Sequence, residues 1–186
     1  MMVAWVSSPH PTHLDEMVKA SYALLEEDVC DRLDAHNLIL MFDVTSLEMM
    51  TSLFATLQSQ GFHMSMVIGY AHDTVLAKAS RVAQNAFDHE CVHLYQVILY
   101  ELKHQLSETT TALQNKLNQL DHDDRLTLKK YLEYHMNALL ASEALYVHRN
   151  TFNYRLNKAI ESSGINIKIQ PFSLLLQIYF IIESLR

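Results

Sequence analysis

The segment from Leu145 to Ile160 limits the fold of this chain more than any other, because it has the periodicity of an amphipathic helix that follows a short corner. Its apolar residues recur at helical spacing and fall on one side, namely Phe152, Leu156, Ala159 and Ile160. A helix rich in small residues, Ala138 to Leu145, precedes the corner at residues 146–149. Two helices joined by so short a turn predict a helix-turn-helix, with its second helix at about residues 150–162.

The polar side of this second helix has the chemistry that a DNA-binding helix needs. Between Ala144 and Ala159 there are three cations and no acid, whereas a generic solvated face usually carries pairs of Glu and Lys. Cations suit phosphates, and the interleaved amide and hydroxyl groups suit base edges. We therefore predict that double-stranded DNA is bound by His148, Arg149, Asn150, Thr151, Asn153, Tyr154, Arg155, Asn157 and Lys158. The alternative is an ordinary amphipathic helix whose polar face is merely hydrated.

Charge is distributed unevenly along the chain. The formal net charge of −7, if spread evenly, would argue against nucleic-acid binding. Residues 125–186 hold eight Lys or Arg and four Asp or Glu, a net charge of +4, while residues 1–124 hold six and seventeen, a net charge of −11. A basic C-terminal domain attached to an acidic N-terminal part is consistent with a DNA-binding domain whose affinity depends on salt concentration.

The string from Val147 to Leu156, Val-His-Arg-Asn-Thr-Phe-Asn-Tyr-Arg-Leu, resembles the start of the recognition helix in the PucR/CdaR family of bacterial transcriptional regulators. The similarity extends from about Leu126 to a closing helix near Leu185. The resemblance implies a sequence-specific transcriptional regulator that binds double-stranded DNA. Because one helix-turn-helix covers too few base pairs to select a site in a genome, we expect the chain to act as a homodimer. An interaction protein whose DNA-binding face is unused is a further alternative.

The residues before this module alternate between strand and helix patterns. Strands are predicted at residues 3–6, 29–33, 38–42, 64–69 and 92–97, and helices at 14–27, 46–60 and 74–87, followed by a helical connector. Ser46 and either Asp73 or Thr74 are the expected helix caps, and Gly61 is an expected helix end. This order predicts an α+β fold in which helices pack on a mixed sheet.

The same order resembles the degenerate GGDEF-like domain of PucR/CdaR proteins, most closely at Ser65 to Tyr70, at the Ala-rich helix Ala77 to Phe87 and at Val92 to Tyr95. We predict this domain at residues 1–98, a helical connector at 99–121 and an all-α helix-turn-helix domain at 122–186. In active GGDEF cyclases the central hairpin carries glycines and acids that bind phosphate and metal, but here it reads Arg32 to Asn37, with no glycine and no acidic pair. We therefore expect no cyclase activity.

The expected assignment is a non-enzymatic regulator without a cofactor. Its first domain serves dimerisation or the response to an unidentified small-molecule effector, although the chain looks like a shortened family member without the usual sensory domain. Two isolated cysteines, Cys30 and Cys91, and no signal peptide predict a cytoplasmic protein. The most apolar run, Leu174 to Ile182, is half the length that a bilayer requires, so no membrane partner is expected.

One competing motif is the run His89-Glu90-Cys91-Val92-His93, which satisfies the H-E-x-x-H pattern of zinc metalloproteases. On a continuous helix its two histidines would share a face and chelate zinc, with the glutamate as general base. The sequence assigns no third ligand, and positions 96 and 99 lack the Gly and His of the extended motif. In a strand, His89, Cys91 and His93 would share a face, which is a second weak metal hypothesis.

Overall fold

The computed structural model describes residues 1–25, 30–71, 73–87 and 89–185. The chain divides into two compact units, Met1–Thr109 and Thr110–Arg186. The first contains a mixed sheet covered by helices, and the second consists of helices throughout its described residues. This arrangement confirms the predicted fold class.

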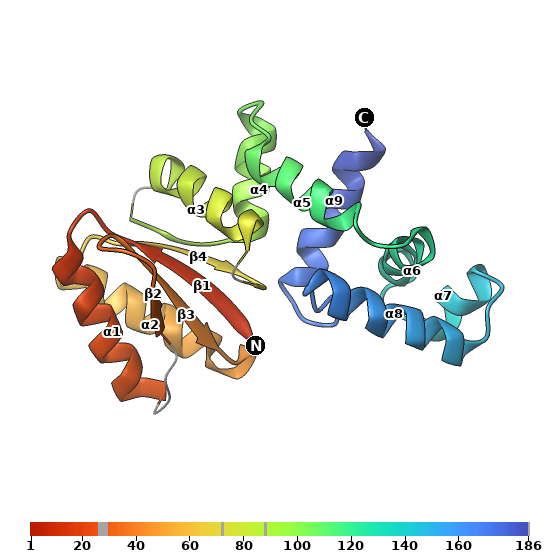
Figure 1. Cartoon of the computed structure of the whole chain (residues 1–186), viewed down its shortest axis with the longest axis horizontal. Coiled ribbons are helices and arrows are strands. Elements are labelled where there is room, and N and C mark those ends of the chain that lie inside the picture. The colour runs from red at the N-terminus through yellow and green to blue at the C-terminus, as the bar shows by residue number, and fades with distance from the viewer. Residues whose placement is uncertain (26–29, 72, 88, 186) are drawn as a thin grey trace. The chain divides into compact units, whose positions relative to one another are not determined.

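The first unit is built on a five-stranded sheet (Figure 1). Its strands are β1 (Met2–Ser7), β2 (Cys30–Arg32), β3 (Asn37–Phe42), β4 (Ser65–Gly69) and β5 (Cys91–His93). They lie in the order β2-β3-β1-β4-β5, with β1 antiparallel to both β3 and β4. The hairpin β2-β3 is also antiparallel, whereas β5 joins β4 in parallel. The first four strands therefore have the arrangement of a split βαβ fold.

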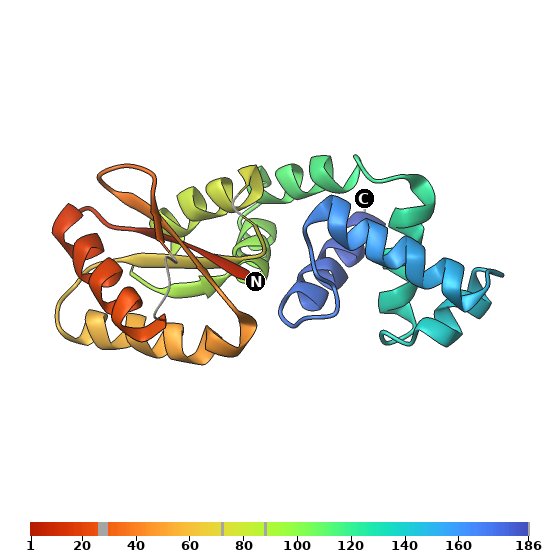
Figure 2. The ribbon, with the colours of Figure 1, turned by 60° about the horizontal axis from the view of Figure 1, so that its bottom comes forward.

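Four helices cover the two faces of this sheet. They are α1 (Pro11–Leu25), α2 (Leu47–Ser59, after a 3₁₀ turn at Val44–Ser46), α3 (Thr74–Ala86) and α4 (Leu94–Lys103). Figures 1 and 2 show α1 and α2 on one face and α3 on the other. The Ser7 and Ser80 hydroxyl oxygens, 3.2 Å apart, link β1 to α3. Because strand residues alternate, Met2, Ala4 and Val6 point to the opposite face, where they are fully buried.

Most of the elements predicted for this unit are confirmed. The Asp73 carboxylate accepts hydrogen bonds from the amides of Val75 and Leu76 at 3.0 and 3.1 Å, so Asp73 caps α3. Gly61 follows α2 with a φ of 91°, a left-handed conformation that favours glycine. The end of the first predicted helix at residues 26 and 27, and the start of the next strand at residue 29, lie outside the described residues.

The strand predicted at residues 92–97 is wrong for most of its length. Strand β5 ends at His93, and helix α4 begins at Leu94. The Gln96 side-chain oxygen accepts a hydrogen bond from the His93 amide at 2.8 Å, which satisfies a donor at the start of the helix. The segment predicted as one helical connector, residues 99–121, instead holds the end of α4 and the separate helix α5 (Glu108–Leu117).

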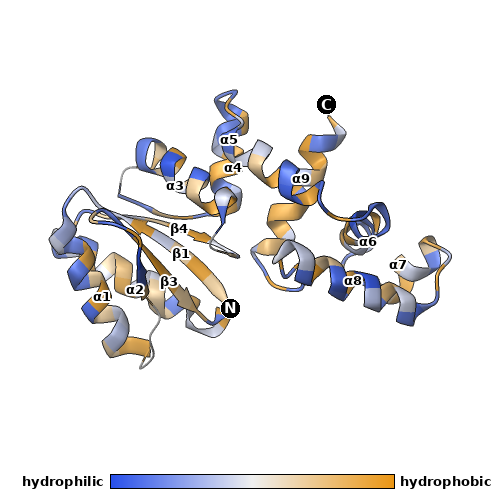
Figure 3. Ribbon diagram, viewed as in Figure 1, coloured by the Kyte–Doolittle hydropathy of each residue, from blue (hydrophilic) through white to orange (hydrophobic). Residues whose placement is uncertain are grey.

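The second unit packs four further helices around an apolar centre. They are α6 (His122–Glu133), α7 (Ala138–Ala144), α8 (Arg149–Ser163) and α9 (Phe172–Ser184). The apolar colour of α9 in Figure 3 runs around much of the helix, and most of its large side chains are buried. None of the helices in the described ranges is long and apolar enough to cross a membrane.

Arg125 fastens α6 to α9. Its guanidinium group pairs with the Glu183 carboxylate, donates a hydrogen bond to the Tyr179 hydroxyl at 3.2 Å, and lies 5.8 Å from the ring centres of Tyr179 and Phe180. These cation–π and hydrogen-bonded contacts hold α9 on α6, the helix on which α8 packs.

Candidate nucleic-acid interface

The corner between α7 and α8 is closed by backbone hydrogen bonds. The Val147 amide donates to the Ser142 carbonyl at 3.1 Å, and the Tyr146 amide donates to the Glu143 carbonyl at 3.0 Å. This pair of bonds is the Schellman motif, which ends a helix with one residue in the left-handed conformation. Tyr146 occupies that position with a φ of 54°. The predicted corner is therefore a defined turn that fixes the direction in which α8 leaves.

Both helices of the motif begin with a side-chain cap. The Asn137 side-chain oxygen accepts from the amides of Leu139 and Leu140, at 3.0 and 3.3 Å, and starts α7. The His148 Nδ1 atom accepts from the Asn150 amide at 3.2 Å and starts α8. Nδ1 is the accepting nitrogen in this cap, so the ring proton of the neutral imidazole lies on Nε2. His148 thus has a structural role at the position predicted for DNA contact.

The buried side of α8 is the one predicted from its periodicity. Phe152 and Ala159 are fully buried, and Leu156 is 2% exposed. Ala141 on α7 is also fully buried, and its small side chain allows the two helices to approach closely. Gly164 ends α8 with a φ of 71°. Packing against α6 and α7 therefore sets which side of α8 remains in solvent.

The solvent side of α8 carries an uninterrupted row of polar side chains. Tyr154 is 70% exposed. The residues that the structure leaves exposed are His148, Arg149, Asn150, Thr151, Tyr154 and Asn157. Asn153, Arg155 and Lys158 are half-buried. The nine predicted site residues therefore lie on one helix and its cap, but they do not form one equally accessible surface.

Two of the three predicted phosphate-binding cations are paired within the chain. The Arg155 guanidinium lies 2.8 Å from the Asp123 carboxylate. The Lys158 ammonium lies 2.5 Å from Asp121 and 2.8 Å from Asp124, whose side chain is 4% exposed. The hydrogen bond from Lys158 lowers the pKa of Asp121 and raises the pKa of Lys158 itself. These pairs join the start of α6 to the middle of α8.

Arg149 differs from those two cations. It is exposed at the first turn of α8, and within the described parts of the chain no carboxylate forms an ion pair with it. Farther along, the Lys168 ammonium donates a hydrogen bond to the Asn157 side-chain oxygen at 2.9 Å. Lys168 was not among the predicted site residues because it follows α8 in the sequence. It places a second exposed cation beside the polar row.

The position of the unit boundary changes the net charge of the second unit. The split at Arg125 gave a net charge of +4 because it left Asp121, Asp123 and Asp124 in the other half. Residues 110–186 contain nine Lys or Arg and seven Asp or Glu, so the net charge of the unit is +2. These three acids pair with Arg155 and Lys158, the two half-buried cations of α8.

The zinc-protease interpretation of residues 89–93 is wrong. His89 has a φ of 58°, Glu90 lies outside any helix, and Cys91–His93 is strand β5. The motif needs both histidines on one face of a continuous helix, which this segment does not form. For the strand variant, no group of three or more His, Cys, Asp or Glu residues lies close enough to hold a metal ion, among the residues that the structure describes. Burial raises the pKa of the Cys91 thiol to about 12, which disfavours a thiolate ligand.

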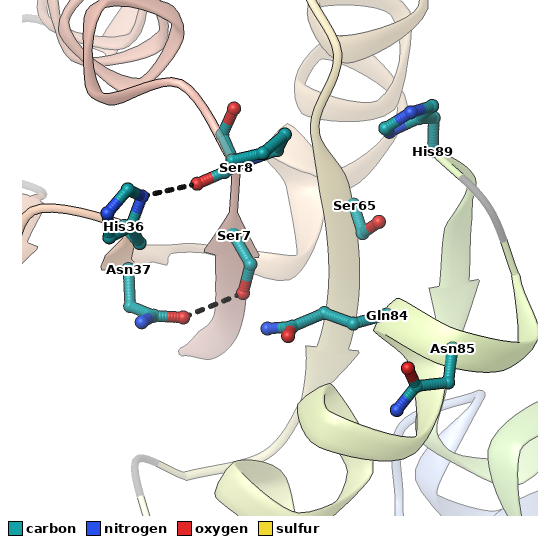
Figure 4. Close-up of a pocket in the computed structure, with 9 residues that line it drawn as sticks. Ser7, Ser8, His36, Asn37, Ser65, Gln84, Asn85 and His89 are labelled. Atoms are coloured by element: carbon teal, nitrogen blue, oxygen red, sulfur yellow. Dashed lines mark hydrogen bonds between the residues drawn. The ribbon is translucent and has the colours of Figure 1, made fainter.

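The first unit contains a polar cavity of about 410 Å³ at the end of β1 (Figure 4). Ser7, Asn37 and His36 come from β1 and the hairpin, and Figure 4 shows Gln84 reaching toward them from α3. The His36 Nδ1 atom lies 3.0 Å from the Ser8 carbonyl, and the Ser7 hydroxyl donates to Asn37 at 2.9 Å. Its described lining contains no Asp, Glu, Lys or Arg. The described lining thus lacks the charged side chains that a magnesium-phosphate site would use.

Comparison with known proteins concerns mainly the second unit. Residues 125–182 match the family described as the PucR C-terminal helix-turn-helix domain. The uncharacterized protein YxkF of Bacillus subtilis (strain 168) is 44% identical over 57 residues, which are 31% of this chain and 18% of YxkF. The aligned residues thus cover less than a fifth of that relative.

Among solved structures, a regulator of polyketide synthase expression from Bifidobacterium adolescentis aligns with 100% of this chain and 80% of its own. The TM-score is 0.48 and the sequence identity is 16%. The family match, by contrast, contains α7, α8 and nearly all of α6 and α9. Residues 125–182 of this chain are therefore a PucR-type C-terminal helix-turn-helix domain.

Proposed function

We propose that this chain is a sequence-specific transcriptional regulator that inserts α8 into the major groove of double-stranded DNA. The observation that carries the proposal is the exposed polar row of α8 within a PucR-type helix-turn-helix domain. The second helix of such motifs lies in the major groove, with its N-terminal residues at the base edges. Its exposed hydroxyl, amide and phenol groups match the hydrogen-bonding groups of those edges.

The ion pairs divide the predicted site residues into two groups. Thr151, Tyr154 and Asn157 face away from the core and are the proposed base-reading residues. Arg149 is the proposed phosphate contact, because its charge has no acid partner within the described residues. Arg155 and Lys158 are proposed to hold α6 against α8, because a cation that is already paired gains less from a phosphate.

The first unit is proposed to be a non-catalytic GGDEF-like domain that serves dimerisation or effector response. Its split βαβ topology supports a relation to that fold class, and its cavity supports a ligand-binding rather than a phosphate-transferring role. Glycines and paired acids, which would bind nucleotide phosphates and metal, are missing from the hairpin sequence at residues 32–37. The proposal therefore assigns no enzymatic activity to the chain.

Altering Asn157 is expected to change which DNA sequence is preferred. Selection from a random duplex library with the full chain, followed by fluorescence anisotropy, would identify the preferred site and its affinity. Asn157→Ala should lower discrimination at one base pair by about 1–3 kcal/mol, because one side-chain contact to a base edge is lost. The matched control is Asn115→Ala, an exposed asparagine on α5, which should leave the preferred site unchanged.

Failure of the wild-type chain to select any sequence would contradict the proposed function and support a role in protein interaction. Selection of the same site with unchanged discrimination by Asn157→Ala would contradict only the role of Asn157. If Asn157→Ala loses affinity equally for all sequences, Asn157 contacts the DNA backbone rather than a base.

The chain is expected to form a homodimer at micromolar concentration. One helix-turn-helix covers too few base pairs to select a site in a genome, so two copies must bind half-sites about one DNA turn apart. Multi-angle light scattering should give twice the 21.5 kDa of the chain. A mass that stays at 21.5 kDa at all micromolar concentrations of the chain would contradict the dimer in solution.

A further inference from the structure

Tyr146 combines two properties that are costly in a folded protein. Its φ of 54° places a bulky aromatic residue in the left-handed conformation, where the side chain crowds the backbone. Its side chain is also 98% exposed, more than any other large apolar or aromatic side chain among the described residues. Neither property contributes to packing, because the ring contacts almost nothing in the folded chain.

Glycine would satisfy the backbone at this corner without strain. The chain uses glycine at two other helix ends, where Gly61 and Gly164 have φ values of 91° and 71°. The hydrogen bonds that close the corner at Tyr146 come from main-chain groups of Val147 and Tyr146, so a glycine would keep them. Gln105 and His135 also take this conformation at helix ends, so it is the nearly complete exposure of an aromatic ring in such a corner that packing and turn formation do not explain.

The location of Tyr146 indicates the role of this exposed ring. It lies two residues before the His148 cap and three before Arg149, at the end of α8 that enters the groove. At the mouth of the groove the nearest groups of the duplex are the phosphates and sugars of its wall, and tyrosine hydroxyls are among the donors that contact them. An exposed phenol at this corner has the chemistry and the position for that contact.

We propose that Tyr146 contacts the DNA backbone, donating a hydrogen bond from its hydroxyl to a phosphate oxygen and so setting how deeply α8 enters the groove. The inference rests on the proposed DNA binding and adds a residue outside the row on α8. Because tyrosine is uncharged, this contact releases no counterion. It should therefore be distinguishable from the Arg149 contact by its salt dependence.

Two substitutions in the full chain separate the hydroxyl from the strained backbone. Tyr146→Phe keeps the ring and the conformation, and should weaken binding to every duplex about tenfold while leaving the slope of log affinity against log salt unchanged. Tyr146→Gly should weaken binding at least as much, yet raise the melting temperature of the C-terminal unit by about 4–8 °C, because strain is removed.

Gln105 provides a matched control in the first unit. It follows α4 with a φ of 58°, is exposed, and lies in the same type of corner, with the Leu106 amide donating to the Glu101 carbonyl at 2.8 Å. Gln105→Gly should likewise stabilise its own unit, followed by Trp5 fluorescence, without a change in DNA affinity. This control shows whether relief of strain by itself alters binding.

The outcomes distinguish this inference from the proposed function. If the wild-type chain does not bind duplex DNA above background, both fail together. If it binds and both Tyr146 variants bind equally well, the proposed function stands and the backbone contact is overturned. A tenfold loss in Tyr146→Phe accompanied by a smaller salt slope would also overturn the uncharged contact. Loss of affinity in both variants, with Tyr146→Gly more stable than the wild-type chain, would support it directly.

Discussion

Replacing Phe152 with alanine is expected to unfold the C-terminal unit at much lower urea concentration and to abolish DNA binding. The Phe152 ring is fully buried in the first turn of α8, and its centroid lies 6.2 Å from that of Tyr131 on α6. Removing a buried phenylalanine side chain costs about 3–5 kcal/mol, through lost burial and the cavity that remains. Small domains are stable by about 5–15 kcal/mol, so this unit would lose a large part of its stability.

Circular dichroism would report the loss of helix, and fluorescence of the only tryptophan, Trp5, would report the first unit separately. The matched control is Tyr154→Ala, two residues away on the exposed side of α8, which should change the unfolding free energy by at most about 0.5 kcal/mol. The control should nevertheless weaken DNA binding. Equal stability of the two variants would contradict the division of α8 into a core side and a binding side.

The periodicity of α8 could be read from the sequence because packing and solvent exposure both follow its helical repeat. The buried positions Phe152, Leu156 and Ala159 are those predicted, and the exposed Thr151 and Tyr154 lie opposite. The Asp73 cap was equally local, because its carboxylate accepts from two amides within three residues of itself, whereas Ser46 precedes α2 without a side-chain cap hydrogen bond. Features that depend on near neighbours in the chain are therefore largely predictable.

The segment after His89 was misassigned because its pattern fits two structures. Val92 to Val97 alternates enough apolar residues for a strand, but Leu94 and Val97 also fall, with the next residue Ile98, on the buried side of a helix. The hydrogen bond between Gln96 and the His93 amide marks the helix start. A cap followed three residues later by glutamine was the available signal, although histidine is an unusual cap.

The ion pairs of α8 could not be predicted from spacing. Asp121, Asp123 and Asp124 lie more than 30 positions before Arg155 and Lys158, and only the packing of α6 on α8 brings them together. The left-handed conformation of Tyr146 was hidden for a different reason. Glycine and asparagine are the usual signals for such a corner, and this chain has neither there.

Removing the charge of Arg149 is expected to affect DNA binding, whereas removing that of Lys158 is expected to affect stability, although both are cations of the same helix. Arg149→Met should weaken binding to all duplexes and reduce the slope of log affinity against log salt by about one unit, because one phosphate contact is lost. Its thermal stability should be nearly unchanged, because Arg149 is exposed and has no acid partner within the described ranges. Anisotropy titrations at several salt concentrations would measure the slope.

Lys158→Met should leave that slope nearly unchanged but lower the melting temperature of the C-terminal unit, because Asp124 is 4% exposed and would lose a cation 2.8 Å away. The pKa of Asp121 is lowered in the folded chain, so its pairing stabilises the fold above the carboxyl pKa of the unfolded chain, and this contribution disappears as the pH falls through the folded pKa. Lys158→Met should therefore also weaken the acid dependence of unfolding. A salt slope reduced equally by both substitutions would show that Lys158 leaves its acids to bind phosphate, and would contradict the structural role assigned to it.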